Sequence, residues 1–280
     1  MNNFLKVTAV ASLFALSAGA NAAVTTVGVA TWDPSIEPID FSADASINQW
    51  FTSDINGNMG LLTTEAGYVD GFENVVTVND SGTNVVGSYL SGAGTYTTIN
   101  DDQASDGTTL QSIASGTELS YAFGGLLAKA DGTLDTSASW IKVYSDTSRD
   151  FFANDLFNKG QEEYVDALDG DLWLSGKFLE LELNVSGTAA FVSSTGVGLI
   201  ELLDGDALGY FDVFGQTADG LDYHLTTEAT ASFINTSITG QDQIAKATVT
   251  VKGETVNIPE PASLALLGLG LLGFATRRKA

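Results

Sequence analysis

The central part of the chain alternates apolar and polar residues with a period of two, the pattern of a strand with one buried and one solvated face. Residues 179–185 and 247–252 show it most clearly. Their apolar members are Leu179, Leu181, Leu183 and Val185, then Ala247, Val249 and Val251. Turn-forming Asp-Gly pairs recur between such segments, at 131–132, 169–170, 204–205 and 219–220. Many short strands separated by such turns predict a mainly β chain folded as an antiparallel β-sandwich.

Further strand candidates and one helical segment complete this prediction. The strand candidates are residues 24–31, 74–78, 119–127, 139–145, 189–193, 210–214 and 223–233. The stretch 150–168 departs from the pattern because it is rich in apolar residues and Gly160 is its only glycine. We therefore expect one short helix there, packed on a sheet edge.

Composition restricts the partners of this chain. Among 280 residues there are 35 acids, 11 basic residues and no cysteine, giving a formal charge of −24. Such a surface repels nucleic acid and anionic lipid, so we expect no nucleic-acid partner. The absence of cysteine excludes disulfides and thiol catalysis, so packing alone must stabilise the fold.

The N-terminus has the three parts of a secretory signal peptide. Lys6 supplies the positive charge, residues 7–15 form an apolar run, and Ala20-Asn21-Ala22 is a small-x-small site. We expect a signal helix over residues 1–22 and cleavage by signal peptidase between Ala22 and Ala23.

The C-terminus carries a second three-part signal. Pro259-Glu260-Pro261 is a stiff, non-helical element, because proline fixes φ and disfavours helix in the residue before it. An apolar stretch, expected to be helical, and a basic stop follow. Their members are Leu264, Leu266, Leu267, Leu269, Leu271, Leu272 and Phe274, then Arg277, Arg278 and Lys279. A helix of about 14 residues spans about 21 Å, less than the ~30 Å hydrocarbon core, which indicates a transient membrane handle.

These tail residues resemble the PEP-CTERM sorting signal of proteins exported by Gram-negative bacteria. The resemblance implies processing by an exosortase near Pro259-Glu260-Pro261 and delivery to the cell surface or extracellular matrix. We accordingly divide the chain into a signal peptide (1–22), an acidic extracytoplasmic β-rich domain (23–257) and a sorting segment (258–280).

A second resemblance concerns the end of the central domain. Residues 208–215 and 222–233 resemble parts of flocculation-associated PEP-CTERM proteins. This implies a structural or adhesive role in exopolysaccharide, floc or biofilm formation, with exopolysaccharide as a partner.

No catalytic residue or metal-ligand set stands out in the sequence, so we expect neither enzymatic activity nor a cofactor. His224, the one histidine, lies in an expected strand without a nucleophile elbow. Glu180 and Glu182 share one strand face, which favours a solvated face over a catalytic pair. The alternative is a secreted glycoside hydrolase, which needs two carboxyls about 5–9.5 Å apart.

A calcium-dependent carbohydrate-binding module is the other alternative. Asp54, Asn56 and Asn58 alternate as in an EF-hand loop, and Glu65 occupies the closing position, but Met59 stands where that loop needs glycine. Two other acidic groups could hold a cation, namely Asp166, Asp169 and Asp171, and Asp204 and Asp206. The aromatic candidates for a sugar-binding face are Trp32, Trp50, Trp140 and Trp173, which suit a core equally well.

Overall fold

The computed structural model describes residues 24–36, 39–52, 54–58, 77–79, 82–84, 89–129, 133–159, 161–188, 191–234 and 245–256. The expected signal helix, the sorting segment and its apolar helix lie outside these residues. No helix among the described residues combines the length and apolar composition that crossing a bilayer requires.

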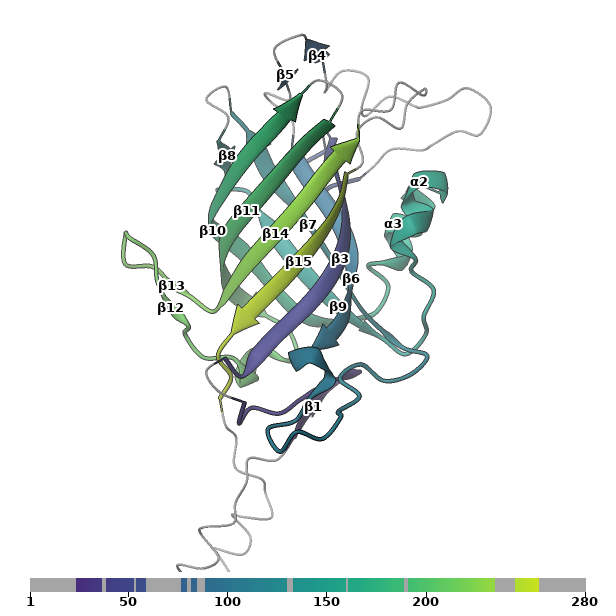
Figure 1. The fold of residues 1–280 in the computed structure, drawn as a ribbon, viewed down its shortest axis with the longest axis vertical. Coiled ribbons are helices and arrows are strands. Elements are labelled where there is room, and N and C mark those ends of the chain that lie inside the picture. The colour runs from purple at the N-terminus through teal and green to yellow at the C-terminus, as the bar shows by residue number, and fades with distance from the viewer. Residues whose placement is uncertain are drawn as a thin grey trace, which may run out of the picture.

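Eight long antiparallel strands form one closed barrel (Figure 1). These strands are β3 (Phe41–Thr52), β6 (Tyr89–Ile99), β7 (Glu118–Ala128), β9 (Trp140–Asp146), β10 (Asp171–Thr188), β11 (Phe191–Asp204), β14 (Leu225–Ile234) and β15 (Ala245–Gly253). Around the barrel they follow the order β6-β3-β15-β14-β11-β10-β9-β7. The ring closes because β7 also pairs with β6, where Gly92 lies opposite Phe123.

The mainly β prediction is confirmed, but closure replaces the expected sandwich. Alternation shows that each strand buries one face, and a sandwich and a barrel both meet that requirement. The two folds differ in whether the first and last strands of the sheet pair with each other, and this pairing depends on contacts between residues far apart in the sequence. Closure also demands close approach of neighbouring strands: a Cβ on Gly94 in β6 would lie 2.0 Å from the Ser46 carbonyl oxygen of β3.

Shorter strands and helical segments connect or flank the eight barrel strands. The short strands are β1 (Thr25–Val27), β2 (Ala30–Trp32), β4 (Thr77–Asn79), β5 (Gly82–Asn84), β8 (Leu134–Asp135), β12 (Gly215–Gln216) and β13 (Asp222–Tyr223). The helical elements are η1 (Asn100–Asp102), η2 (Ala153–Asp155), α2 (Leu156–Lys159), α3 (Gln161–Asp166) and η3 (Leu208–Tyr210). The strand expected at 210–214 is wrong: it begins in η3, and Phe211 makes only an isolated bridge to Thr255.

Apolar side chains fill the barrel interior. Ala247, Val249 and Val251 are buried, as their alternation predicts. In β10 the register shifts between Phe178 and Glu180, so Phe178 also enters the core. A cavity of about 10 Å³ remains among the interior side chains, room for about one water molecule. The described interior is therefore a packed core.

Aromatic rings close the lower end of the barrel. Trp32 of β2 is fully buried and packs edge-on against Phe41, with ring centroids 5.7 Å apart, and against Trp173 at 6.2 Å. Phe211 stacks on Trp32 at 6.2 Å. The β1–β2 hairpin thus contributes to the core at the end of the barrel where it lies in Figure 1.

Residues 147–168, here called the flap, carry η2, α2 and α3 over the outer wall of the barrel (Figure 1). The small side chains of Ala93 and Ala122 leave room on this wall for the flap residues Phe151, Leu156 and Tyr164. The predicted helical segment is confirmed. Its expected place on a sheet edge is wrong, because β6 and β7 pair beneath it and form a continuous wall.

Candidate functional site

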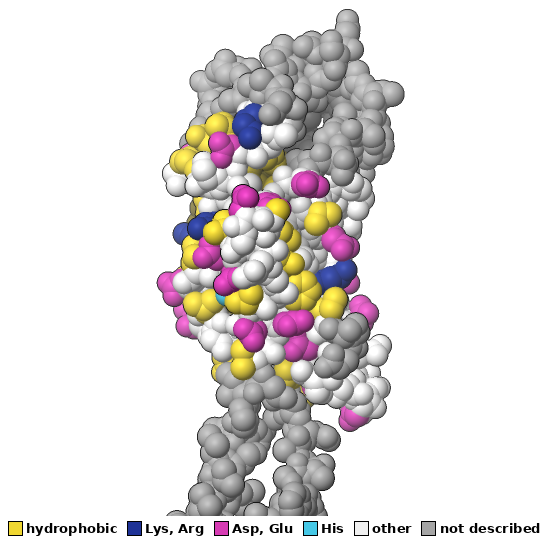
Figure 2. Space-filling view, turned by 90° about the vertical axis from the view of Figure 1, so that its left-hand side faces the viewer, with side chains coloured by type: hydrophobic (Ala, Val, Ile, Leu, Met, Phe, Trp, Pro, Cys, Tyr) yellow, Lys and Arg dark blue, Asp and Glu magenta, His cyan; other side chains and the backbone are white. Residues whose placement is uncertain are grey.

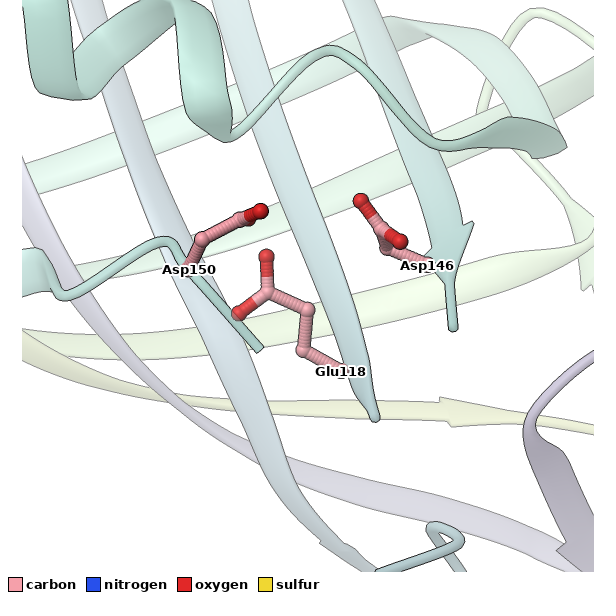
Figure 3. Close-up of side chains that lie close together, drawn as sticks. All are labelled: Glu118, Asp146 and Asp150. Carbon is pink, nitrogen blue, oxygen red and sulfur yellow. The ribbon is translucent and has the colours of Figure 1, made fainter. Parts of the chain in front are cut away.

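Three carboxylates converge where the flap leaves the barrel wall. Glu118 begins β7, Asp146 ends β9, and these two residues lie opposite each other in the β7–β9 pairing. Asp150 belongs to the flap. One oxygen from each carboxylate lies within 4.8 Å of the other two, and Figure 3 shows the three side chains directed toward a common space. We call these three residues the acidic seam.

The outward face of β7 explains the burial of Glu118. Strand alternation places Glu118 on the same face as Ser120 and Ala122. The flap covers that face: Ser120 Oγ donates to the Ala167 carbonyl oxygen at 2.9 Å, and Ala122 packs in the flap cluster. Glu118 is consequently only 4% exposed.

The Glu118 carboxylate has few hydrogen-bond donors. The backbone N–H of Phe151 donates to Oε1 across a long 3.4 Å, and Oε2 is buried without a hydrogen-bond partner among the described residues. Burial raises the pKa of Glu118 to about 8, and the charges of Asp150 and Asp146 act in the same direction.

Asp146 has the opposite environment within the same seam. The N–H and Oγ of Ser148 both donate to its Oδ1, at 2.8 and 2.9 Å, and the Ser148 N–H is the main cause of its lowered pKa. Asp169 also hydrogen-bonds to Asp146, and burial together with this contact raises the pKa of Asp169. Asp169 therefore adds a fourth acid beside the seam.

Glu163 provides a contrast a few residues away. Glu163 belongs to α3 of the flap, and its side chain is fully buried. Its Oε2 forms an ion pair with Lys159 Nζ at 2.8 Å. Its Oε1 accepts a hydrogen bond from the N–H of Phe152. Two buried glutamates thus bind adjacent backbone amides of the flap, and of these two only Glu163 forms an ion pair with a lysine among the described side chains.

Another buried carboxylate, that of Asp33, lies near the lower end of the barrel. Asp33 is 4% exposed, like Glu118. The N–H and Oγ of Ser35 and of Ser105 all donate to it, at 2.5–2.9 Å. Burial opposes ionisation of Asp33, but these hydrogen bonds outweigh that effect and lower its pKa to about 2.

The seam has two chemical capabilities. Carboxylate oxygens in this number and spacing are the ligands that hard divalent cations prefer. A carboxyl with a raised pKa beside an ionised one is also the arrangement of a general acid and its partner. Of the acids grouped from the sequence, Asp169 lies beside the seam, Asp166 ends α3 and the exposed Asp171 begins β10; Glu118, Asp146 and Asp150 were not predicted. The one available signal was a lone acid at the start of the otherwise uncharged segment 118–128.

The catalytic candidates considered from the sequence lie apart from the seam. His224 follows β13, and its Nδ1 accepts a hydrogen bond from the Leu202 N–H at 3.2 Å, so it bridges two strands. Glu180 and Glu182 are exposed on the outer face of β10, as a solvated strand face requires. Asp204 accepts from the N–H of Gly205 as part of a turn, and Asp206 lies beyond it.

The loop expected to resemble an EF-hand is satisfied internally. The side-chain amide nitrogens of Asn56 and Asn58 donate hydrogen bonds to the Asp54 carboxylate, at 3.2 and 2.6 Å. The two asparagines therefore turn N–H groups toward Asp54, whereas a cation site would need their oxygens there. Trp50 Nε1 donates to the Gly57 carbonyl oxygen at 3.1 Å, which docks the loop on the outer wall. Met59 and Glu65 lie outside the described residues.

Three of the four tryptophans belong to cores. Trp32, Trp50 and Trp173 are at most 2% exposed. Trp140 is half-buried, and its Nε1 donates to the Ile55 carbonyl oxygen at 3.0 Å. These positions assign the tryptophans to packing rather than to an open sugar-binding face.

The residues expected to be processed lie outside the described residues. They are Ala20, Ala22 and Ala23 at the expected cleavage site, the motif Pro259-Glu260-Pro261, and the apolar and basic residues from Leu264 to Lys279.

Comparison with known proteins bears on the tail. No curated protein matches the chain. Residues 257–279 match the sequence profile of the PEP-CTERM protein-sorting motif, which confirms the resemblance seen in Pro259-Glu260-Pro261 and the basic end. The chain therefore carries the sorting signal of an exported exosortase substrate.

Proposed function

We propose that this protein is a non-enzymatic component of the cell surface or extracellular matrix of a Gram-negative bacterium. It serves a structural or adhesive role in exopolysaccharide, floc or biofilm formation. The observation that carries this proposal is the sorting motif at residues 257–279, which directs the attached domain out of the cell. Signal peptidase removes residues 1–22, and an exosortase processes the tail.

The barrel suits such a role because its described part is a packed, acidic body. Its interior is filled by side chains, and on the face that Figure 2 shows, acids lie spread among apolar and neutral side chains. The chain holds 35 acids against 11 basic residues, which favours solubility outside the cell and discourages self-association. The resemblance of residues 208–215 and 222–233 to flocculation-associated proteins adds exopolysaccharide as the partner.

Deletion of residues 257–280 in the native host tests sorting and role separately. We expect the truncated protein to be lost from the surface and matrix fractions, and cell aggregation to fall as in a full gene deletion. A matched control replaces Lys246 on β15 with glutamine, which removes one basic charge outside the tail. Unchanged surface amounts of the truncated protein would contradict the sorting step. Normal sorting of the wild type, with unchanged aggregation after gene deletion, would contradict the structural role alone.

A carboxylate-dependent hydrolase is the second candidate, favoured by the raised pKa of Glu118 beside Asp146 and Asp150. In that case the flap must move, because Phe151 and the neighbouring backbone cover Glu118. Incubation of the protein with the host's own exopolysaccharide tests this candidate. New reducing ends that disappear in Glu118→Gln but persist in Glu180→Gln would establish it and overturn the non-enzymatic proposal.

A further inference from the structure

We propose that the acidic seam of Glu118, Asp146 and Asp150 is a calcium site that fastens the flap to the barrel wall. The ligands come from two parts of the chain: Glu118 at the start of β7, and Asp146 at the end of β9 with Asp150 in the flap that follows it. A bound ion would therefore join two neighbouring strands to the residues that lead into α2 and α3.

The spacing of the carboxylates fits a calcium ion. Three oxygens no more than 4.8 Å apart share a point at most about 2.8 Å from each of them (4.8 Å divided by √3), and Ca²⁺–oxygen bonds are ~2.3–2.6 Å long. Side-chain adjustments of a few tenths of an ångström close the remaining difference. Mg²⁺ needs shorter bonds of ~2.0–2.1 Å and stricter octahedral geometry, so the seam favours the larger ion.

The buried oxygen of Glu118 is the second, independent indication of a ligand. Glu118 is 4% exposed, and its Oε2 has no hydrogen-bond partner among the described residues. Its carboxylate points into the space that Asp146 and Asp150 also face (Figure 3). A buried carboxylate oxygen without a donor is costly, and a cation in that space would satisfy it.

Countercharge from the protein itself is missing at this position. Among the described side chains, no lysine or arginine forms an ion pair with Glu118, Asp146 or Asp150. Lys159, the basic residue of the flap helices, binds Asp155 and Glu163 instead. The flap is thus neutralised at Glu163 by a lysine, and a divalent cation would do the same at the seam.

Extracellular calcium modules bind with dissociation constants on the order of 10⁻⁴–10⁻³ M, and we expect this range for the seam. The inference concerns binding by the purified chain and does not depend on the proposed matrix role. Failure to bind calcium would leave the sorting and aggregation experiments unaffected.

Calorimetric titration of calcium chloride into the full-length chain tests the site. We expect one calcium per chain in the wild type, and at least tenfold weaker binding in Asp150→Asn and Glu118→Gln. Two controls each remove one acid elsewhere: Glu180→Gln on the exposed face of β10, and Asp54→Asn in the internally bonded loop. Both controls should bind as the wild type does.

Thermal unfolding and amide hydrogen exchange locate the effect. At calcium about tenfold above the dissociation constant, the wild type should melt about 2–4 °C higher than with a chelator. Amides of residues 147–152 should exchange more slowly with calcium in the wild type but not in Asp150→Asn. No calcium-dependent shift in the wild type, or an equal shift in Asp150→Asn, would overturn the proposal; an equal loss in Asp54→Asn would move the site to that loop.

Discussion

The lower end of the barrel and the flap seam hold a buried carboxylate in opposite ways. Asp33 and Glu118 are both 4% exposed. Asp33 accepts hydrogen bonds from Ser35 and Ser105, and its pKa falls to about 2. Glu118 accepts one long hydrogen bond among acidic neighbours, and its pKa rises to about 8. Two carboxylates of equal exposure thus have opposite pKa shifts: the hydrogen bonds from Ser35 and Ser105 outweigh burial at Asp33, whereas burial dominates at Glu118.

Glu163 is a third buried carboxylate, and its negative charge is balanced by an ion pair with Lys159. The three sites differ in what they need from outside the chain. Protein groups satisfy the carboxylates of Asp33 and Glu163 by hydrogen bonds and an ion pair. The Oε2 of Glu118 has no such partner among the described residues, and a bound cation would supply one. Substitutions of Glu163, Asp33 and Glu118 should therefore differ in how strongly they destabilise the protein.

Glu163→Ala should destabilise the protein most, by about 3 kcal/mol. It removes a fully buried side chain, the acceptor of the Phe152 N–H and the partner of Lys159. Urea unfolding followed by tryptophan fluorescence measures the loss. The control Glu162→Ala removes an exposed acid from the same helix and should change little. Equal effects of the two substitutions would show that the buried pair does not hold the flap.

Asp33→Asn should cost about 2 kcal/mol in the same measurement. An asparagine has one acceptor oxygen, so it cannot accept all the hydrogen bonds that Ser35 and Ser105 donate. Asp106→Asn is the control, because Asp106 is exposed and accepts only from Thr108 in its own turn. If Asp33→Asn were as stable as the wild type, the hydrogen bonds at the lower end would contribute nothing.

The difference between wild type and Asp33→Asn should depend on pH. The pKa of Asp33 is lowered from its ordinary 3.8 to about 2 in the folded protein, so the unfolded chain takes up this proton first as pH falls. The stabilisation by Asp33 is therefore complete above about pH 4 and is lost as the pH falls through about 2. Unfolding free energies of both proteins at about pH 5, 3 and 2 should converge. A difference that stays constant over this range would refute the lowered pKa.

Glu118→Gln should have the smallest effect, within about 0.5 kcal/mol of the wild type in calcium-free buffer, or a slight gain. Glutamine keeps an acceptor for the Phe151 N–H and turns an amide donor toward Asp146 and Asp150. Paired with Asp33→Asn, this substitution isolates the effect of the surroundings at equal burial. A loss as large as that of Asp33→Asn would mean that the Glu118 carboxylate is itself stabilising without a cation.

Local patterns in the sequence predicted the elements better than their assembly. The alternation at 247–251 identified the inward face of β15, and the break in strand alternation at 150–168, with Gly160 as its only glycine, located the flap helices. Barrel closure escaped prediction because it depends on the pairing of β6 with β7, for which a two-residue period carries no information. The sorting tail was predictable because its signal is contiguous in the chain.

The seam escaped prediction for the same physical reason as barrel closure. Glu118 and Asp146 come together through the register of β7 and β9, and Asp150 joins them because the chain turns back over the wall. The loop at Asp54–Asn58 had the more suggestive spacing, yet its asparagines donate to Asp54. The spacing of possible ligands along the chain therefore suggested the wrong loop, because the three seam residues are brought together by strand pairing and by the fold of the flap.

A crystal structure of the full-length protein grown with calcium chloride would show directly whether the acidic seam binds the ion. We expect an anomalous calcium peak at ~2.3–2.6 Å from an oxygen of each of Glu118, Asp146 and Asp150. Crystals grown with calcium that show Glu118 still without a partner, and no peak between the three carboxylates, would contradict it.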